Sequence, residues 1–243
     1  MEKQTVIITG ASSGIGLEIA RYFLEKGSNV VINSRTESKL QEVFNELGGG
    51  DHLAMIAGDV ADKAIGELLV KTAIERFGSA DVLVNNAGIY ENKPFLEVTE
   101  DHLDRFLRTN LKGTFFTTQS VIPQMQKQRN GVIINIGSPL VYHAMAGSPS
   151  TAPISSKGAI HALTHQLAVE FGKDNIRVNT VAAGLIRTPM HDENIDQAAG
   201  IHLLNRIGEP EEVAQMVYSI ACNKLITGAI INVDGGMGAG HYL

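Results

Sequence analysis

The chain has 243 residues, a length at which α/β folds often form around one core, so we expect a single domain over residues 1–243. Hydrophobic residues make up 44% of the chain and charged residues 19%, which is ordinary globular usage and excludes a disordered polypeptide. The net charge of −6 is spread along the sequence without a basic cluster, which argues against nucleic acid or an anionic membrane as a partner.

The number of cysteines and the first residues of the chain indicate the cellular compartment. Cys222 is the only cysteine, so the chain can form no internal disulfide and offers no thiolate pair to a metal. Such usage fits a reducing compartment. The first apolar stretch, residues 6–8, is far shorter than a signal or membrane segment. We therefore expect a cytoplasmic protein that holds no metal.

Short apolar runs alternate with amphipathic helical segments along the chain. The runs lack the polar alternation of half-exposed strands, as expected for parallel strands that helices cover on both faces. The predicted strands are residues 5–9, 29–33, 53–57, 82–85, 132–136, 177–181 and 230–233. The alternation predicts repeated βαβ units and therefore an α/β fold with a Rossmann-type, doubly wound parallel sheet of about seven strands.

Three segments between these strands have a distinct pattern. Residues 15–23 form one helical stripe that ends before Gly27, and residues 101–125 are long enough for an extended helix that reaches past Pro123. Residues 137–153 contain three prolines and several small residues. We predict that this last segment is a loop.

The first predicted strand is followed at once by a glycine-rich turn, Thr9-Gly10-Ala11-Ser12-Ser13-Gly14-Ile15-Gly16, which opens into a helix. The N–H groups and the dipole of a helix N-terminus favour an anion there. Glycine permits positive φ and a close approach of phosphate to the backbone, and the two serine hydroxyls add donors. The turn predicts a bound dinucleotide; a plain strand-to-helix connection is the alternative.

Further marks follow this turn in a fixed order. Each stands after a predicted strand or in a predicted helix: Asp59-Val60, Asn85-Asn86-Ala87-Gly88, Asn110, Ser138, Lys157, and Gly184 to Thr188. In this order and context the chain resembles the short-chain dehydrogenase/reductase family over almost its whole length. The resemblance implies a nicotinamide dinucleotide, a small-molecule alcohol or carbonyl substrate, and a homodimer or homotetramer formed through long helices.

The resemblance also implies where the cofactor lies. Asp59 and Val60 are expected along the adenine, and the segment Asn86, Ala87 and Gly88 beside the adenosine ribose. The residues expected to flank the nicotinamide amide and the pyrophosphate are Gly184, Ile186 and Thr188. Polar side chains at such positions also serve as caps or turn hydrogen bonds in many proteins, which is the alternative interpretation of each.

The end of the second predicted strand discriminates between the two nicotinamide dinucleotides. An acidic residue there accepts hydrogen bonds from a ribose 2′-OH and repels a 2′-phosphate, whereas this chain has Ser34 and Arg35. A hydroxyl beside a guanidinium suits a phosphate. We therefore predict NADP(H) in preference to NAD(H); the alternative is that Arg35 only solvates a loop.

The resemblance implies that Ser138, Lys157 and Asn110 are catalytic, together with a tyrosine four residues before the lysine, and that Lys157 also reaches the nicotinamide ribose hydroxyls. That position is Pro153 in this chain. An acid that protonates the developing alkoxide contributes about 10²–10⁴-fold, and proline has no proton to give. Tyr142, in the loop after Ser138, is the candidate substitute, and the neighbouring histidine at position 143 is a weaker one.

Two functions therefore remain open from the sequence. The first is an NADP-dependent oxidoreductase with an atypical relay through Ser138, Lys157 and either Tyr142 or water. The second is a family member without redox activity that binds NADP(H) for sensing, partner binding or a non-redox reaction. His161 and His165 have the i, i+4 spacing of a metal pair. No acidic third ligand lies nearby in the sequence, and the resemblance implies that this helix packs in a subunit interface, so we expect the two histidines to pack there.

Overall fold

A single parallel sheet forms the centre of the computed structural model, which describes residues 3–191 and 194–240. Within these ranges the sheet has seven strands in the order β3-β2-β1-β4-β5-β6-β7. The strands are β1 (Thr5–Ile8), β2 (Asn29–Ser34), β3 (Leu53–Ala57), β4 (Val82–Asn85), β5 (Gly131–Gly137), β6 (Ile176–Ala183) and β7 (Ile230–Val233). The seven predicted strands and the doubly wound sheet are thus confirmed.

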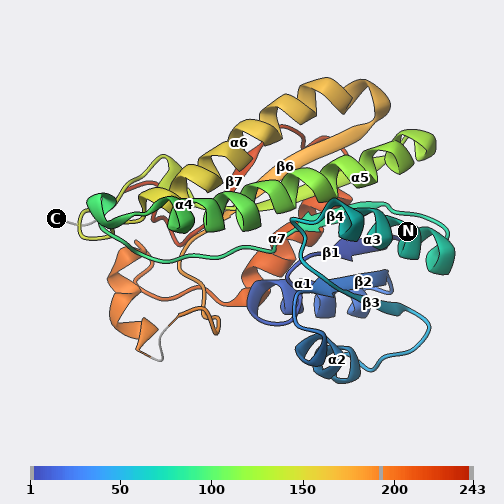
Figure 1. Cartoon of the computed structure of the whole chain (residues 1–243), viewed down its shortest axis with the longest axis horizontal. Coiled ribbons are helices and arrows are strands. Elements are labelled where there is room, and N and C mark those ends of the chain that lie inside the picture. Colours follow the sequence, from blue (N-terminus) through green and yellow to red (C-terminus); the bar gives the residue numbers. More distant parts are fainter. Residues whose placement is uncertain (1–2, 192–193, 241–243) are drawn as a thin grey trace.

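Helices cover both faces of the sheet (Figure 1). Helices α1 (Gly14–Glu25), α2 (Glu37–Glu46) and α7 (Pro210–Cys222) lie on one face. Helices α3 (Lys63–Phe77), α5 (Gly113–Gln128) and α6 (Thr151–Phe171) lie on the other. Shorter helical elements are α4 (Glu100–Phe106), the π turn η2 (Leu107–Lys112), and the 3₁₀ turns η1 (Phe95–Glu97), η3 (Pro139–Val141), η4 (Gly172–Asp174) and η5 (Ile195–Ile201).

Each face of the sheet has its own apolar core. Val6 and Ile8 of β1 pack toward α1 and α7, while Ile7 between them packs toward α3 and α5. All three side chains are buried, because side chains of a strand alternate between its faces and both faces are covered here. This accounts for the continuous apolar runs of the sequence.

Two segments differ from the sequence prediction. The extended helix past Pro123 is present, but the π turn η2 interrupts it between α4 and α5. The segment predicted as a loop up to residue 153 ends earlier, because α6 begins at Thr151 and includes Pro153 in its first turn. The first four N–H groups of a helix have no partner within it, so proline costs no hydrogen bond at this place.

A search of the described helices for a stretch long and apolar enough to cross a membrane finds none.

Candidate active site

A cavity of about 590 Å³ opens at the carboxyl ends of the strands. The loops that follow β1 to β6 all contribute to its wall. The strand order reverses between β1 and β4, and ligands of doubly wound sheets bind in the crevice at such a reversal. Its size is that of a small-molecule or cofactor site.

The glycine turn after β1 has the shape of a phosphate cradle. Gly10 and Gly14 have φ values of +67° and +55°, a region that side chains rarely adopt. The Nδ2 of Asn86 donates to the carbonyl oxygen of Gly10 at 2.9 Å and fixes the turn from the next loop. A Cβ on Gly16 would collide with this amide. Glycine is therefore required both to form this turn and to let the loop after β4 pack on it.

The N-terminus of α1 faces the cavity without a side-chain cap. Ser13 is the N-cap residue, but its hydroxyl makes no capping hydrogen bond, and the first turn carries no acidic side chain. Ser12, Ser13 and Ile15 line the cavity. The open N–H groups and the glycine cradle together fit the pyrophosphate of a dinucleotide, with Ser12 and Ser13 as additional donors.

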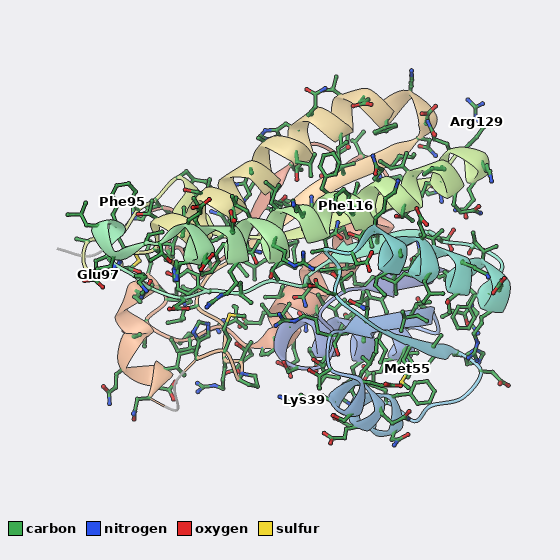
Figure 2. The ribbon with its side chains drawn as sticks, in the orientation of Figure 1. Lys39, Met55, Phe95, Glu97, Phe116 and Arg129 are labelled. Carbon is green, nitrogen blue, oxygen red and sulfur yellow. The ribbon has the colours of Figure 1, made fainter. Side chains whose placement is uncertain are left out.

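Two cations lie at the end of the cavity that follows β2. Arg35 and Lys39 both line it, and Lys39, labelled in Figure 2, lies one helical turn further along on α2. Ser34 also lines the cavity. The nearby carboxylate of Asp59 is engaged by Arg108, whose Nη2 lies 3.1 Å from Oδ2. This end of the cavity is therefore suited to an anionic group.

Lys157 and Ser138 lie at the other end. The Nζ of Lys157 donates to the carbonyl oxygen of Ile136 at 2.6 Å, next to the end of β5 where Ser138 begins its loop. The stem of Lys157 keeps some exposure along the cavity, yet burial of its ammonium lowers the pKa of Lys157 to about 8. Ser138 accepts the N–H of Leu140 at 3.3 Å, which leaves the hydroxyl proton for another acceptor.

Asn110 lies in the π turn and supports this end from behind. It is fully buried. Its Oδ1 accepts the N–H of Ile89 at 2.8 Å, and its Nδ2 donates to the carbonyl of Ile89 at 3.1 Å and to the hydroxyl of Ser156 at 2.9 Å. One amide therefore ties the loop after β4 to the residue that precedes Lys157. Such π turns occur frequently at functional sites.

The structure brings most of the predicted cofactor residues together. Those that line the cavity are Gly10, Ser12, Ser13, Gly14, Ile15, Ser34, Arg35, Asp59, Val60, Asn86, Ala87, Gly88, Lys157, Gly184, Ile186 and Thr188. Gly16 lies beneath the turn rather than in the wall. The segment 137–153 also reaches the cavity, as do Met190, His191 and Ile201 from the segment after β6, of which residues 192–193 are outside the described residues.

Tyr142 is not brought to this cavity. Tyr142 is not among the described residues that form the cavity wall. Its hydroxyl donates instead to Oδ1 of Asn232 in β7. Burial raises the pKa of the Tyr142 phenol. The expectation that this side chain approaches the reacting end is therefore not met. Pro153 is buried in the first turn of α6, one turn before Lys157.

Several residues of the cavity wall were not found from the sequence. They are Lys39, Tyr90, Asn92 and Met237, besides further apolar residues. Lys39 could have been predicted from the sequence, since it follows Arg35 by four residues, about one helical turn. Tyr90 comes two residues after Gly88, but tyrosines in loops more often serve as packing residues. Methionine has no positional signal at all.

The two histidines of α6 do not share one environment. His161 is buried, and the centre of its ring lies 6.3 Å from that of Tyr142. It therefore packs inside the chain rather than in an interface as predicted. Burial, with smaller contributions from the charges of Lys157 and His165, lowers the pKa of His161 to about 4. His165 is exposed. The described residues contain no group of three or more side chains suited to a metal ion.

Comparisons with known proteins agree with this geometry. The chain is 35% identical to a 3-oxoacyl-[acyl-carrier-protein] reductase, FabG, of Thermotoga maritima, with 98% of each chain covered. It is 36% identical to the (2S)-[(R)-hydroxy(phenyl)methyl]succinyl-CoA dehydrogenase subunit BbsD of Thauera aromatica, with 97% of each covered. The crystal structure of gox2181 superposes with a TM-score of 0.93 at 29% identity, covering 99% of this chain and 97% of that one.

A family model described as short chain dehydrogenase matches residues 4–199. This match covers the glycine turn, the loop after β4 and the segment from Ser138 to Lys157. The chain belongs to the short-chain dehydrogenase family.

Proposed function

We propose that the protein is an NADP(H)-dependent oxidoreductase that interconverts an alcohol and a carbonyl compound by an atypical proton relay. The observation that carries the proposal is the single cavity that joins the glycine cradle, the cations Arg35 and Lys39, and the reacting pair Ser138 and Lys157. A dinucleotide extended between these ends would place its nicotinamide near Ser138, and bound NADPH supplies a hydride.

Charge supports the preference for NADP(H). Arg35 is a permanent cation with a planar fork of donors, and Lys39 adds a second positive charge on the same wall. The hydroxyl of Ser34 donates to the carbonyl of Thr36 at 3.2 Å and keeps the turn between these cations compact. A 2′-phosphate would be held there by charge-assisted hydrogen bonds.

The residues of the chain supply the remaining chemistry at the reacting end. Ser138 is proposed to donate a hydrogen bond to the substrate oxygen and so to stabilise negative charge that develops there. Lys157 is proposed to bind the nicotinamide ribose and to hold positive charge near the same oxygen. Asn110 keeps Ile89 and Ser156 in place beside them.

The wall around the substrate position is largely apolar. Met145, Met190 and Met237 line it with Leu140 and Leu185. Methionine adapts to irregular ligand shapes. We infer that the substrate presents an apolar body beside its carbonyl group; whether it is a thioester, as the names of two relatives suggest for those proteins, is part of the test below.

We also propose a homodimer or homotetramer formed through the long helices. Phe115, Phe116 and Leu163 of α5 and α6 line a second, shallow groove together with Ala159 and Ala162. Phe116 is labelled in Figure 2 on α5. Phe115 is 44% exposed, and aromatic side chains in such grooves are typical of subunit contacts.

The cofactor preference is tested by titration. Wild-type protein is expected to bind NADPH more tightly than NADH, measured by cofactor fluorescence. Arg35→Gln removes a charge-assisted contact worth about 1.5–3 kcal/mol, so the Kd for NADPH is expected to rise roughly 10- to 100-fold while that for NADH changes little. Arg129→Gln is the control, since Arg129 lies at the far end of α5 (Figure 2). Tighter binding of NADH by the wild type refutes the preference.

Pro153 favours a second candidate function, a cofactor-binding protein without redox activity. Where the family resemblance implies a phenol, the first turn of α6 has a buried proline without a proton to donate. Turnover separates the two candidates. NADPH oxidation with ethyl acetoacetate, acetoacetyl-CoA, cyclohexanone or benzaldehyde at about 1 s⁻¹ or faster supports the oxidoreductase, whereas NADPH binding without turnover supports the second candidate.

A further inference from the structure

We propose that Tyr90 is the proton donor of this site and takes the place of the phenol that position 153 lacks. The inference rests on the proposed function and adds to it a residue and a role. Tyr90 is the only tyrosine among the described residues that line the cavity wall. Tyr142 lies outside this wall and donates its hydroxyl proton to Asn232. A phenol is therefore present in the cavity, but it comes from the loop after β4 instead of from α6.

The backbone of this loop passes directly beside Lys157. Gly88, two residues before Tyr90, lies so close that a Cβ built on it would be 3.4 Å from Nζ of Lys157. The same Cβ would be 3.3 Å from Oδ1 of Asn110. The side chain of Tyr90 thus starts from a segment in contact with the two residues that define the reacting end.

Asn110 fixes the position from which Tyr90 projects. Both backbone groups of Ile89, the residue before Tyr90, are hydrogen-bonded to the one amide of Asn110, at 2.8 and 3.1 Å. That amide also donates to Ser156, next to Lys157. The loop that carries Tyr90 and the helix that carries Lys157 are therefore held as one unit, which gives the phenol the fixed placement that acid catalysis requires.

The phenol proton already points at an acceptor in the cavity wall. The hydroxyl of Tyr90 donates to Oδ1 of Asn92 at 3.0 Å, and the hydroxyl of Ser148 lies 3.4 Å from the same phenol oxygen. Asn92 and Ser148 both line the cavity. A substrate oxygen would replace Oδ1 of Asn92 as the acceptor, and Ser148 would stabilise the phenolate that remains.

The proposed step balances in atoms and electrons. Bound NADPH would supply a hydride to the carbonyl carbon, with loss of one of its own C–H bonds and formation of NADP⁺, while the π electron pair of the C=O bond moves to oxygen. That oxygen forms an O–H bond with the proton of Tyr90 while the phenol O–H bond breaks. The phenolate beside Ser148 then regains a proton from solvent, so that reduction consumes one hydride and one solvent proton. Ser138 and Lys157 stabilise the oxygen and its surroundings throughout.

The test compares two tyrosine-to-phenylalanine variants of the full chain, Tyr90→Phe and Tyr142→Phe. Each removes one hydroxyl and keeps the ring. Steady-state NADPH oxidation is measured with the best of the carbonyl probes named above. Tyr90→Phe is expected to lower kcat by about 10²–10⁴-fold and to leave the Kd for NADPH unchanged. Tyr142→Phe is expected to keep the wild-type kcat.

These measurements distinguish a failure of the Tyr90 proposal from a failure of the proposed oxidoreductase function. If Tyr90→Phe keeps the wild-type kcat, or if only Tyr142→Phe loses it, the donor is not Tyr90 while the oxidoreductase stands. If the wild type binds NADPH but turns over none of the probes, the proposed function fails and the donor with it. A loss in Tyr90→Phe that appears as a raised KM with unchanged kcat assigns the residue to substrate binding and overturns the acid role.

Discussion

Single residues at the reacting end show how burial controls protonation. His161 sits one turn after Lys157 on α6, inside the chain, and no described hydrogen-bond partner reaches its Nε2. Burial is the largest cause that lowers the pKa of His161 to about 4, followed by the charges of Lys157 and His165. The imidazole is therefore neutral in the folded protein at neutral pH, and charging it opposes folding.

This pKa shift predicts a pH dependence of stability. Between about 4 and the ordinary value of 6.5 the unfolded chain binds a proton at His161 that the folded chain does not, so the free energy of unfolding should rise with pH in this window. The slope from one such proton is at most about 1.4 kcal/mol per pH unit. Burial also lowers the pKa of His191, which acts in the same direction. Urea unfolding of His161→Leu across the window should show a smaller slope; an unchanged slope would remove His161 as the cause.

The sequence predicted the glycines and most of the charged residues of the cavity, but few of the residues that line the substrate position. Gly10, Arg35 and Lys157 were predicted because their chemistry and order admit few other roles. Tyr90 was not, since its loop is fixed by the hydrogen bonds between Ile89 and Asn110, which are 21 positions apart in the chain and meet only in the fold. Tyr142 was favoured for its nearness in sequence to Ser138, but η3 turns it toward β7.

The element that most changes the chemistry is α6. Its first internal backbone bond runs from the N–H of Ile154 to the carbonyl of Ser150 at 3.0 Å, so Pro153 occupies the last position at which a missing N–H costs no bond. Its fixed φ also suits a helix. The helix thus begins in the usual manner although the residue that the family resemblance implies at this position is absent.

This placement predicts opposite effects of proline at two sites of α6. Pro153→Ala should lower the free energy of unfolding by only about 0.4–1 kcal/mol, mainly through the greater freedom of the unfolded chain. Ala162→Pro, in the middle of the same helix, should lower it by about 3 kcal/mol or more. Denaturant unfolding measures both. Equal losses in the two variants would show that Pro153 has a packing role beyond the helix start.

The predicted and observed limits coincide in β3, β4 and β7, although of these three strands only β4 is buried along its whole length. The start of α6 was not predicted, because a proline and several small residues predict a loop equally well. The contact with Ser150 that starts the helix depends on how the chain returns from η3. The amino-acid composition of this segment does not determine the path of the chain.

On the scale of the whole molecule, the exposed groove of α5 and α6 predicts an assembly. Light scattering on the eluting protein should give two or four times the chain mass of 26.1 kDa. Phe115→Glu puts a charge into the groove and should return the mass to that of one chain. Leu68→Glu, on the exposed side of α3, is the control and should keep the wild-type mass. A wild-type protein with the mass of one chain would contradict the assembly.

The π turn η2 has a consequence for the phase of the long helix on which it lies. A turn closed by i→i+5 bonds holds one residue more than an α turn, and one residue corresponds to a rotation of about 100°. The half before the turn and the half after it are thus rotated relative to an unbroken helix. Asn110 can face the loop after β4, while Thr117, on the other half, donates to Asn85 at 2.6 Å within the core. Deleting Leu111 would straighten the helix and rotate Asn110 relative to Thr117, so that the two side chains could no longer keep both of these hydrogen bonds.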